Sequence, residues 1–526
     1  MKTDDNGYRL IVRACGDNMT NRGISRQDPK TREWVEVETD PELYRRQVYE
    51  KLGLDPNEKP TLKKIECPFT RGYLYPPGEE RVITDEERMM PDLKFQRAMY
   101  WTFDDFPELE KWHVENTAGL DLLGEAVRKP VFRIPYTREN ENTSIFEACL
   151  FLSEVQMMRV WARALQARAN YRLGIGDIDG ATYDIVTIHH LGRHVGKQGM
   201  LVSWLVGIAF EGMAYATGIG SNPEFPPTKE QLERLVAELD ALPPRRTLIE
   251  AIESERLFGL AALQDIYWGN SNNLLYDTPF GEMLPRIIWT LDINIAMARQ
   301  NKVYDVLTGK SKTIDGREFD DNMRETSSIS LPPLPLLFVR SRTHTIMDAL
   351  STLFIPAMQA EREASRRMEC VENMQRLTLA LLLYEKEHGS LPDGDWRAAL
   401  MKTGVPAQWF QCPSCHGLAE DETTYAMIGN VPNAVSSPNQ ILLAEVLQPQ
   451  KFGEGDGRLP FEKAVFWQRG FARPLELRPK DFDGFGSAHP RCTNLGFRSG
   501  AMRAVSDTID PDVLRTLLDG SATELP

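Results

Sequence analysis

The sequence has few cysteines and no long uninterrupted hydrophobic run. Seven cysteines in 526 residues are too few for a scaffold held together by disulfides, and their pairing cannot be deduced from the sequence. The most apolar window, residues 200–219, contains Glu211 and three glycines, so it predicts a buried helix rather than a membrane span. No apolar segment follows Met1–Asp5, as a signal peptide would require. We therefore expect a cytoplasmic chain, or one whose true N-terminus has been trimmed.

The chain also lacks an excess of positive charge. It carries 61 basic and 76 acidic residues, and its formal net charge is -15 at pH 7. Nucleic-acid binding depends on clustered Lys and Arg side chains at phosphates, and no long basic block is present. We therefore expect no nucleic-acid partner. A hydrophobic content of 42% and a charged content of 26% are typical of a globular protein, and the length predicts two or three domains.

The familiar catalytic motifs are missing as well. There is no Gly-x-Ser-x-Gly motif and no Walker loop, and Gly174–Gly176 lacks the preceding strand that a dinucleotide-binding loop needs. His190 and His194 have the helical spacing of a metal pair, but Leu191 stands where a metalloprotease has its glutamate. A packed or solvated helix face explains this pair more simply. We predict no catalytic residues and no enzyme.

Two regions precede residue 336. We predict that the N-terminal and middle parts are mostly helical, although residues 1–140 are mixed and irregular, are interrupted by prolines and indicate no particular fold on their own. Residues 141–335 have apolar side chains at helical spacing and short connections, which predict a domain of antiparallel helix hairpins. Within it, Thr228–Gln231 has the sequence of a capping box, and its helix is stopped by Pro243-Pro244.

One buried charge is expected in this helical domain. Glu211 lies among Ala209, Phe210 and Met213. A buried carboxylate needs a cation, and Arg159 or Arg163 could supply it. We interpret Glu211 as half of a structural ion pair rather than as a catalytic acid.

Residues 336–526 have the pattern of an α+β domain. Six residues at intervals of four and three fall on one face of a long helix, which ends before Gly389 with Pro392 behind it. Short candidate strands follow, and they predict an antiparallel sheet against which the helix packs. The six residues are Cys370, Met374, Leu377, Leu381, Tyr384 and His388, and the candidate strands are 424–428, 440–446, 464–467, 494–498 and 501–505.

Four motifs occur in this domain in a fixed order. Cys412-Pro413-Ser414 is followed by Ile441–Glu445, then by His489-Pro490, and nine residues separate His489 from Ser499-Gly500. This order, over about residues 350–510, resembles the pseudopilin-like family that is marked by a His-x9-Asp-Gly motif. The chain departs from that family at Ser499, which replaces the aspartate, and in the polar segment Val339–Thr345, where the family has an apolar helix start.

The resemblance implies a structural role in the cell envelope. It leads us to expect a non-enzymatic scaffold protein that binds a protein partner, such as a secretion or pilus-like assembly. Membrane association is expected only if an upstream segment is missing. A cytoplasmic helical-repeat adaptor is an alternative, because no export signal is visible.

A zinc- or ligand-binding protein is the other alternative. Cys412 and Cys415 form a Cys-x-x-Cys, and His489 and Cys492 form a His-x-x-Cys. Together these four residues could supply a tetrahedral zinc ion, provided that the two loops meet. A disulfide or free thiols, with His489 in a structural hydrogen bond, would account for the same residues. We expect no cofactor, and this zinc ion is the alternative.

Overall fold

The computed structural model of the chain describes most of its helices and one main sheet. The predicted strand 464–467, Cys149 and Pro490 lie outside the described residues. The residues that the structure describes are 5–16, 25–27, 34–36, 41–68, 99–135, 152–267, 293–310, 313–314, 317–318, 342–415, 417–429, 437–452, 455–460, 486–487, 489, 492–506 and 509–521.

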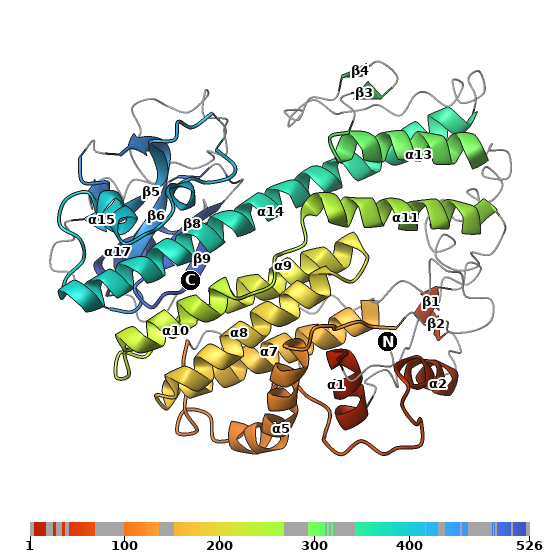
Figure 1. Cartoon of the computed structure of the whole chain (residues 1–526), viewed down its shortest axis with the longest axis horizontal. Coiled ribbons are helices and arrows are strands. Elements are labelled where there is room, and N and C mark those ends of the chain that lie inside the picture. Colours follow the sequence, from red (N-terminus) through yellow and green to blue (C-terminus); the bar gives the residue numbers. More distant parts are fainter. Residues whose placement is uncertain are drawn as a thin grey trace.

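The N-terminal and middle parts are mostly helical, as predicted (Figure 1). Their helices are α1 (Gly7–Cys15), α2 (Pro41–Leu52), α5 (Leu109–Val127), α7 (Leu152–Gly174), α8 (Ile178–Gly196), α9 (Leu201–Tyr215), α10 (Lys229–Asp240), α11 (Leu248–Tyr267) and α13 (Ile293–Leu307). Two short hairpins, β1 (Ser25–Gln27) with β2 (Trp34–Glu36) and β3 (Thr313–Ile314) with β4 (Arg317–Glu318), accompany them. Helices α7, α8 and α9 pack on one another in chain order through short connections.

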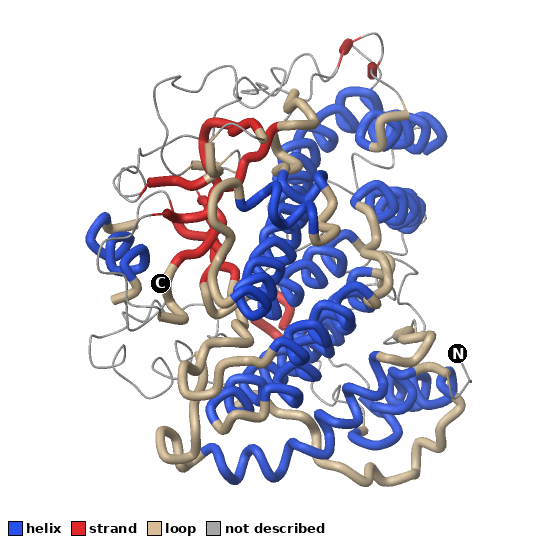
Figure 2. Tube along the Cα trace, turned by 60° about the vertical axis from the view of Figure 1, so that its left-hand side comes forward, coloured by secondary structure: helices blue, strands red, loops and turns tan. Residues whose placement is uncertain are grey.

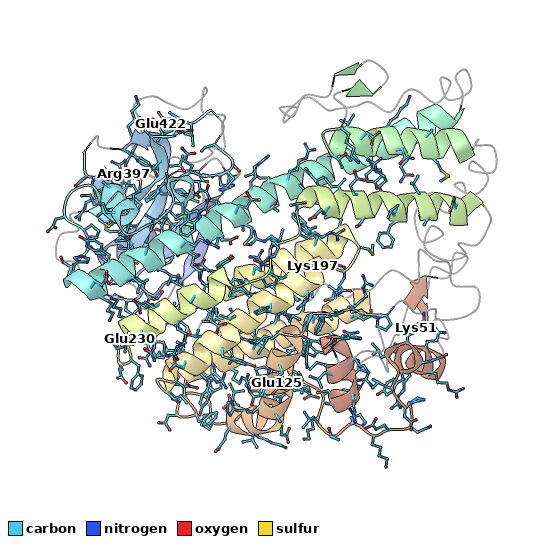
Figure 3. All side chains as sticks on the ribbon, viewed as in Figure 1. Lys51, Glu125, Lys197, Glu230, Arg397 and Glu422 are labelled. Carbon is cyan, nitrogen blue, oxygen red and sulfur yellow. The ribbon has the colours of Figure 1, made fainter. Side chains whose placement is uncertain are left out.

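Local sequence signals fix several of these helices. The capping box of α10 is confirmed, because Thr228 Oγ1 accepts a hydrogen bond from Gln231 N at 3.3 Å and Gln231 Oε1 accepts one from Thr228 N at 3.0 Å. Glu230, in the first turn of α10, marks this start in Figure 3. Helices α8 and α9 approach closely at two glycines, since a Cβ on Gly207 would lie only 2.5 Å from the carbonyl oxygen of Gly192.

The long helix predicted for the C-terminal domain is α14 (Arg342–His388), and it ends at the predicted residue. Gly389 follows with φ of 79°. Cys370, Met374, Leu377 and Leu381 of the predicted face are fully buried, whereas His388 is exposed and stacks on Tyr384. Helix α14 crosses the molecule from α13 to the sheet (Figure 1).

The sheet lies beside the C-terminal half of α14, on the side away from α9 and α10 (Figure 2). Its strand order is β7-β5-β6-β8-β9, with β5 (Glu422–Gly429), β6 (Ile441–Lys451), β7 (Arg458–Pro460), β8 (Cys492–Phe497) and β9 (Met502–Ser506). Strands β5, β6, β8 and β9 pair antiparallel, as predicted, and the short β7 adds to β5 in parallel. Helices α15 (Trp396–Lys402), η2 (Ala407–Phe410) and α17 (Pro511–Asp519) complete the domain.

A single buried core joins the helices to one face of the sheet. It runs from Ile185 in α8 and Phe210 in α9, through Leu377 in α14, to Leu443 in β6. The apolar window 200–219 contains α9, which is buried here as predicted. Within the described ranges, no helix combines the length and the apolar character needed to cross a membrane.

Candidate metal centre

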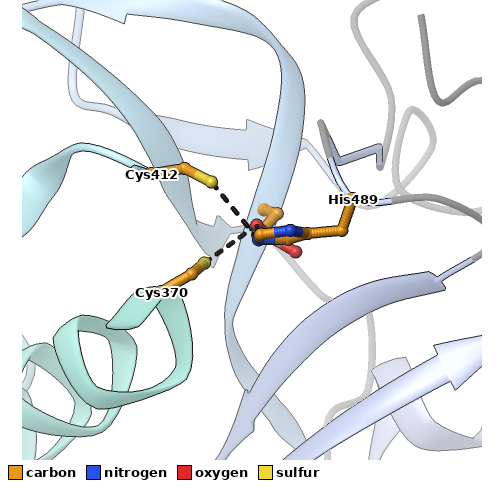
Figure 4. A group of neighbouring side chains, drawn as sticks. Cys370, Cys412 and His489 are labelled. Carbon is orange, nitrogen blue, oxygen red and sulfur yellow. Dashed lines mark hydrogen bonds and ion pairs between the residues drawn. The ribbon is translucent and has the colours of Figure 1, made fainter. Parts of the chain in front are cut away.

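Four side chains from four separate segments meet between α14 and the sheet (Figure 4). Cys370 comes from α14, Cys412 from the chain just after η2, Glu445 from β6, and His489 from the residues before β8. One ligand atom from each lies within 4.8 Å of the other three. All four residues are at most 2% exposed, so the cluster is closed to solvent.

Three pairs of these ligand atoms lie 3.4 Å apart or less. Cys370 Sγ lies 3.0 Å from Glu445 Oε1, and His489 Nε2 lies 3.4 Å from the same oxygen. His489 Nε2 is also 3.3 Å from Cys412 Sγ. Two sulfur atoms, one imidazole nitrogen and one carboxylate oxygen therefore point to a common centre.

Further polar groups surround these four. Glu363 Oε1 lies 2.6 Å from His489 Nδ1, on the far side of the ring from the centre. Tyr425 donates its hydroxyl hydrogen to Cys370 Sγ at 3.2 Å, and the side-chain amide of Asn494 points to the same sulfur at 3.5 Å. The backbone N–H of Asn494 donates to Glu445 Oε2 at 2.7 Å, which leaves Oε1 facing the centre.

Burial and neighbouring charges shift the pKa values of His489, Cys370 and Cys412. Burial lowers the pKa of His489, but Glu445, Cys412 and Glu363 outweigh burial and raise that pKa to about 11. Burial raises the pKa of the Cys370 thiol to about 12, and the hydrogen bond with Cys370 raises the pKa of the Cys412 thiol to about 12. Without a metal ion, an imidazolium therefore lies between two carboxylates and two neutral thiols.

In space, His489 lies between Cys412 and Glu363, so the three side chains are arranged like the thiol, imidazole and carboxylate of a cysteine hydrolase. Catalysis by such a triad needs a thiolate that a substrate can reach. Cys412 is 2% exposed and its thiol pKa is raised to about 12, so neither condition holds. The arrangement therefore favours metal binding or a buried ion-pair network over nucleophilic chemistry.

The structure brings together two of the four residues that the sequence suggested as ligands. Cys412 and His489 are in the cluster, whereas Cys415 and Cys492 are not among its four ligands. The Cys415 side chain hydrogen-bonds to Cys412, and Cys492 Sγ accepts a hydrogen bond from Arg367 at 3.6 Å. None of these three cysteines forms a disulfide with another described residue.

Cys370 and Glu445 were not among the sequence-based ligands. Cys370 had been placed on the buried helix face, and Glu445 at the end of an apolar strand. A glutamate at a buried strand position is the signal that could have found the site, because such a carboxylate needs a partner.

The other polar residues singled out in the sequence have structural roles. His194 Nε2 lies 2.7 Å from the carbonyl oxygen of Val127, so this ring is used in a helix contact. His190 and His194 belong to no metal-type cluster in the part of the chain that the structure describes.

Glu211 is buried in an ion pair as predicted, but its partners were predicted wrongly. Arg193 and Arg245 hold it, at 3.1 Å and 2.6 Å, in place of Arg159 or Arg163. The close packing of α8 on α9 brings Arg193 to Glu211, and Arg245 reaches it from the connection after α10.

Comparison with known proteins adds one partial match. A family model, SBP_bac_10, described as a protein of unknown function (DUF1559), matches residues 359–410. These residues include all the described side chains of α14, with Cys370, and extend to the end of η2. Neither the curated proteins nor the solved structures give a match.

Proposed function

We propose that this chain is a non-enzymatic structural protein of the cell envelope. In this proposal a pseudopilin-like domain is fused to a helical domain, and the chain binds a protein partner in a secretion or pilus-like assembly. The observation that carries the proposal is that α14 packs against the helical domain on one side and against the sheet on the other. A helix that is fixed on both sides is a rigid support for such a partner.

One side of α14 is bound to the helical domain. Glu372 pairs with Arg245 at 3.1 Å, and Arg376 pairs with Asp240 of α10 at 3.3 Å. Met368 packs against the apolar cluster of α9, α11 and α13. The chain's own helices therefore cover this side of α14.

The opposite side of α14 is bound to the sheet. Cys370 contacts Glu445 of β6, and Thr378 lies so close to β8 that a Cβ on Gly496 would come 2.6 Å from its Oγ1. Arg498, in the turn after β8, holds Glu385 with two nitrogens at 2.9 to 3.1 Å. This long helix across an antiparallel sheet is the arrangement that the motif order led us to expect.

The residue that departs from the family motif supports the same proposal. Ser499 is fully buried, and its carbonyl oxygen accepts a hydrogen bond from Gly220 N at 2.9 Å in the loop after α9. An aspartate here would place a charge in the contact between the two domains. An uncharged serine is therefore suited to a turn that packs against the chain's own helical domain.

The family-model match over residues 359–410 is in keeping with this proposal, since it falls on the helix that carries the resemblance. An enzyme would need a reactive side chain that solvent can reach. The thiols of the buried cluster do not meet that need.

In-cell crosslinking tests the proposal. A photoreactive amino acid would replace Leu257, which is 67% exposed on α11, and Glu233, an exposed charged residue on α10, would serve as the matched control. We expect the chain in the envelope fraction and a Leu257 adduct with a component of a secretion or pilus-like assembly. A chain found only in the cytoplasmic fraction, with no such adduct, contradicts the proposal and favours the adaptor alternative.

A further inference from the structure

We propose that Cys370, Cys412, Glu445 and His489 bind a structural zinc ion that joins α14 to the sheet. This inference is independent of the proposed cellular role. It rests on the distances within the cluster, on the groups behind each ligand, and on burial.

The distances fit a tetrahedral zinc site. Zinc bonds of about 2.3 Å to sulfur and about 2.0–2.2 Å to nitrogen or oxygen place neighbouring ligand atoms about 3.3–3.8 Å apart. Three of the pairs here are 3.0, 3.3 and 3.4 Å apart, and all the ligand atoms lie within 4.8 Å of one another. Changes of about 1 Å or less in these separations would complete the tetrahedron.

A metal ion would also bind at once the atoms that share the hydrogen of His489 Nε2. His489 Nε2 carries at most one hydrogen, yet Cys412 Sγ and Glu445 Oε1 both lie within 3.4 Å of it. That hydrogen can point well to only one of the two acceptors. A zinc ion at the centre would bind the nitrogen, the sulfur and the oxygen together.

Each ligand has an outer partner of the kind found at zinc sites. Glu363 lies on His489 Nδ1, an arrangement that fixes the ring and directs Nε2 at the metal. Cys370 Sγ faces two donors, Tyr425 and Asn494, as suits a thiolate. The Cys415 side chain hydrogen-bonds to Cys412 and so favours the thiolate form of Cys412.

The number of ligands and their burial indicate a structural role. Catalytic zinc keeps an open position for water, whereas structural zinc has four protein ligands. Here four ligands are at most 2% exposed, and they come from segments up to 119 residues apart, from Cys370 to His489. Zinc would fasten the segment after η2 and the segment before β8 to α14.

Metal analysis of the purified full chain, without an affinity tag or chelator, tests the inference. We expect one zinc per chain, with loss of the metal in Cys370→Ser and in Cys412→Ser. Cys492→Ser and Cys15→Ser are matched controls, because these cysteines lie outside the four ligands, and both variants should keep the zinc. Loss in Cys492→Ser with retention in Cys370→Ser would overturn the assigned ligands.

Two measurements on the unaltered chain test the inference even if the cysteine variants fail to fold. An organomercurial that modifies thiols should release one zinc per chain. Replacement of zinc by cobalt(II) should give the intense visible bands of a tetrahedral site together with a sulfur-to-cobalt charge-transfer band. A chain that contains no zinc as purified and binds no cobalt, or one with a Cys370–Cys412 disulfide, would overturn the inference.

Discussion

Ser499 and Gly218 touch where the β8–β9 turn meets the loop after α9. A Cβ on Gly218 would lie 2.6 Å from Ser499 Oγ and 2.8 Å from Ser499 Cβ. Ser499 is fully buried, so its side chain has no room to move away. This contact fixes the turn of the sheet to the helical domain.

Gly218→Ala should destabilise the protein, because the added methyl group would overlap Ser499 and Ser221. We expect a loss of about 1–3 kcal/mol in the free energy of unfolding, measured with urea. Gly212→Ala is the control. Its nearest atom, Met368 Cε, would be 3.5 Å away, and alanine favours the helix by up to about 1 kcal/mol. Equal effects of the two substitutions would show that the contact with Ser499 is not tight.

Ser499→Asp, which restores the aspartate of the family motif, should destabilise the fold in a pH-dependent way. Burial raises the pKa of a carboxyl group, so the introduced carboxyl group would lose its proton more readily in the unfolded chain than in the folded chain. The loss of stability should therefore grow as the pH rises from about 4 to 8. Ser499→Asn, which adds similar volume without charge, should show no such growth. Thermal unfolding across this pH range compares the two variants.

Arg245→Gln should leave the buried Glu211 carboxylate poorly compensated. Arg245 holds both oxygens of Glu211, at 2.6 and 3.1 Å, and Glu211 is 1% exposed. Removing the whole pairing of a buried charge costs about 3–5 kcal/mol, and because Arg193 remains 3.1 Å from Glu211 we expect a loss of about 2–3 kcal/mol. The control is Arg234→Gln, which breaks an exposed pair with Asp179 and should cost at most about 1 kcal/mol. Similar unfolding midpoints for the two variants would contradict a buried role for Glu211.

His189 should make the protein sensitive to acid. Burial, and then Arg193, lower its pKa from 6.5 to about 3, and both ring nitrogens lack a hydrogen-bond partner among the described residues. As the pH falls from 6.5 towards 3, the unfolded chain binds a proton that the folded chain does not, so stability is lost on acidification.

His189→Gln should reduce this dependence by up to about 1.4 kcal/mol per pH unit. The slope of unfolding free energy against pH measures the effect. His388→Gln, at an exposed ring, is the control and should leave the slope in place. An unchanged slope in His189→Gln would show that the folded chain takes up the proton at little cost.

Glu363→Gln should weaken zinc binding without removing a ligand. The carboxylate lies 2.6 Å from His489 Nδ1 and orients the ring, and loss of such a partner lowers metal affinity about 10- to 100-fold. Competition with a chromophoric chelator measures the affinity. Glu361→Gln, two residues earlier on α14 and outside the cluster, should leave the affinity within about 2-fold. Equal affinities for the two variants would remove Glu363 from the site.

The sequence by itself determined the features that depend on neighbours along the chain. The capping box at Thr228, the end of α14 at His388 and the β8–β9 turn at Ser499-Gly500 follow from local backbone hydrogen bonding and side-chain period. The α+β class followed from the same periods, because a helical stripe and alternating short strands each need a partner surface.

Only the tertiary structure decided which distant side chains meet. Cys412 and His489 were found because each stands in a short motif, whereas Cys370 and Glu445 are brought together by the rotation of α14 over β6. Arg193 and Arg245 reach Glu211 through the close packing of α8 on α9 and the path of the chain after α10. Rotation and packing depend on the whole core, so no local pattern could specify them.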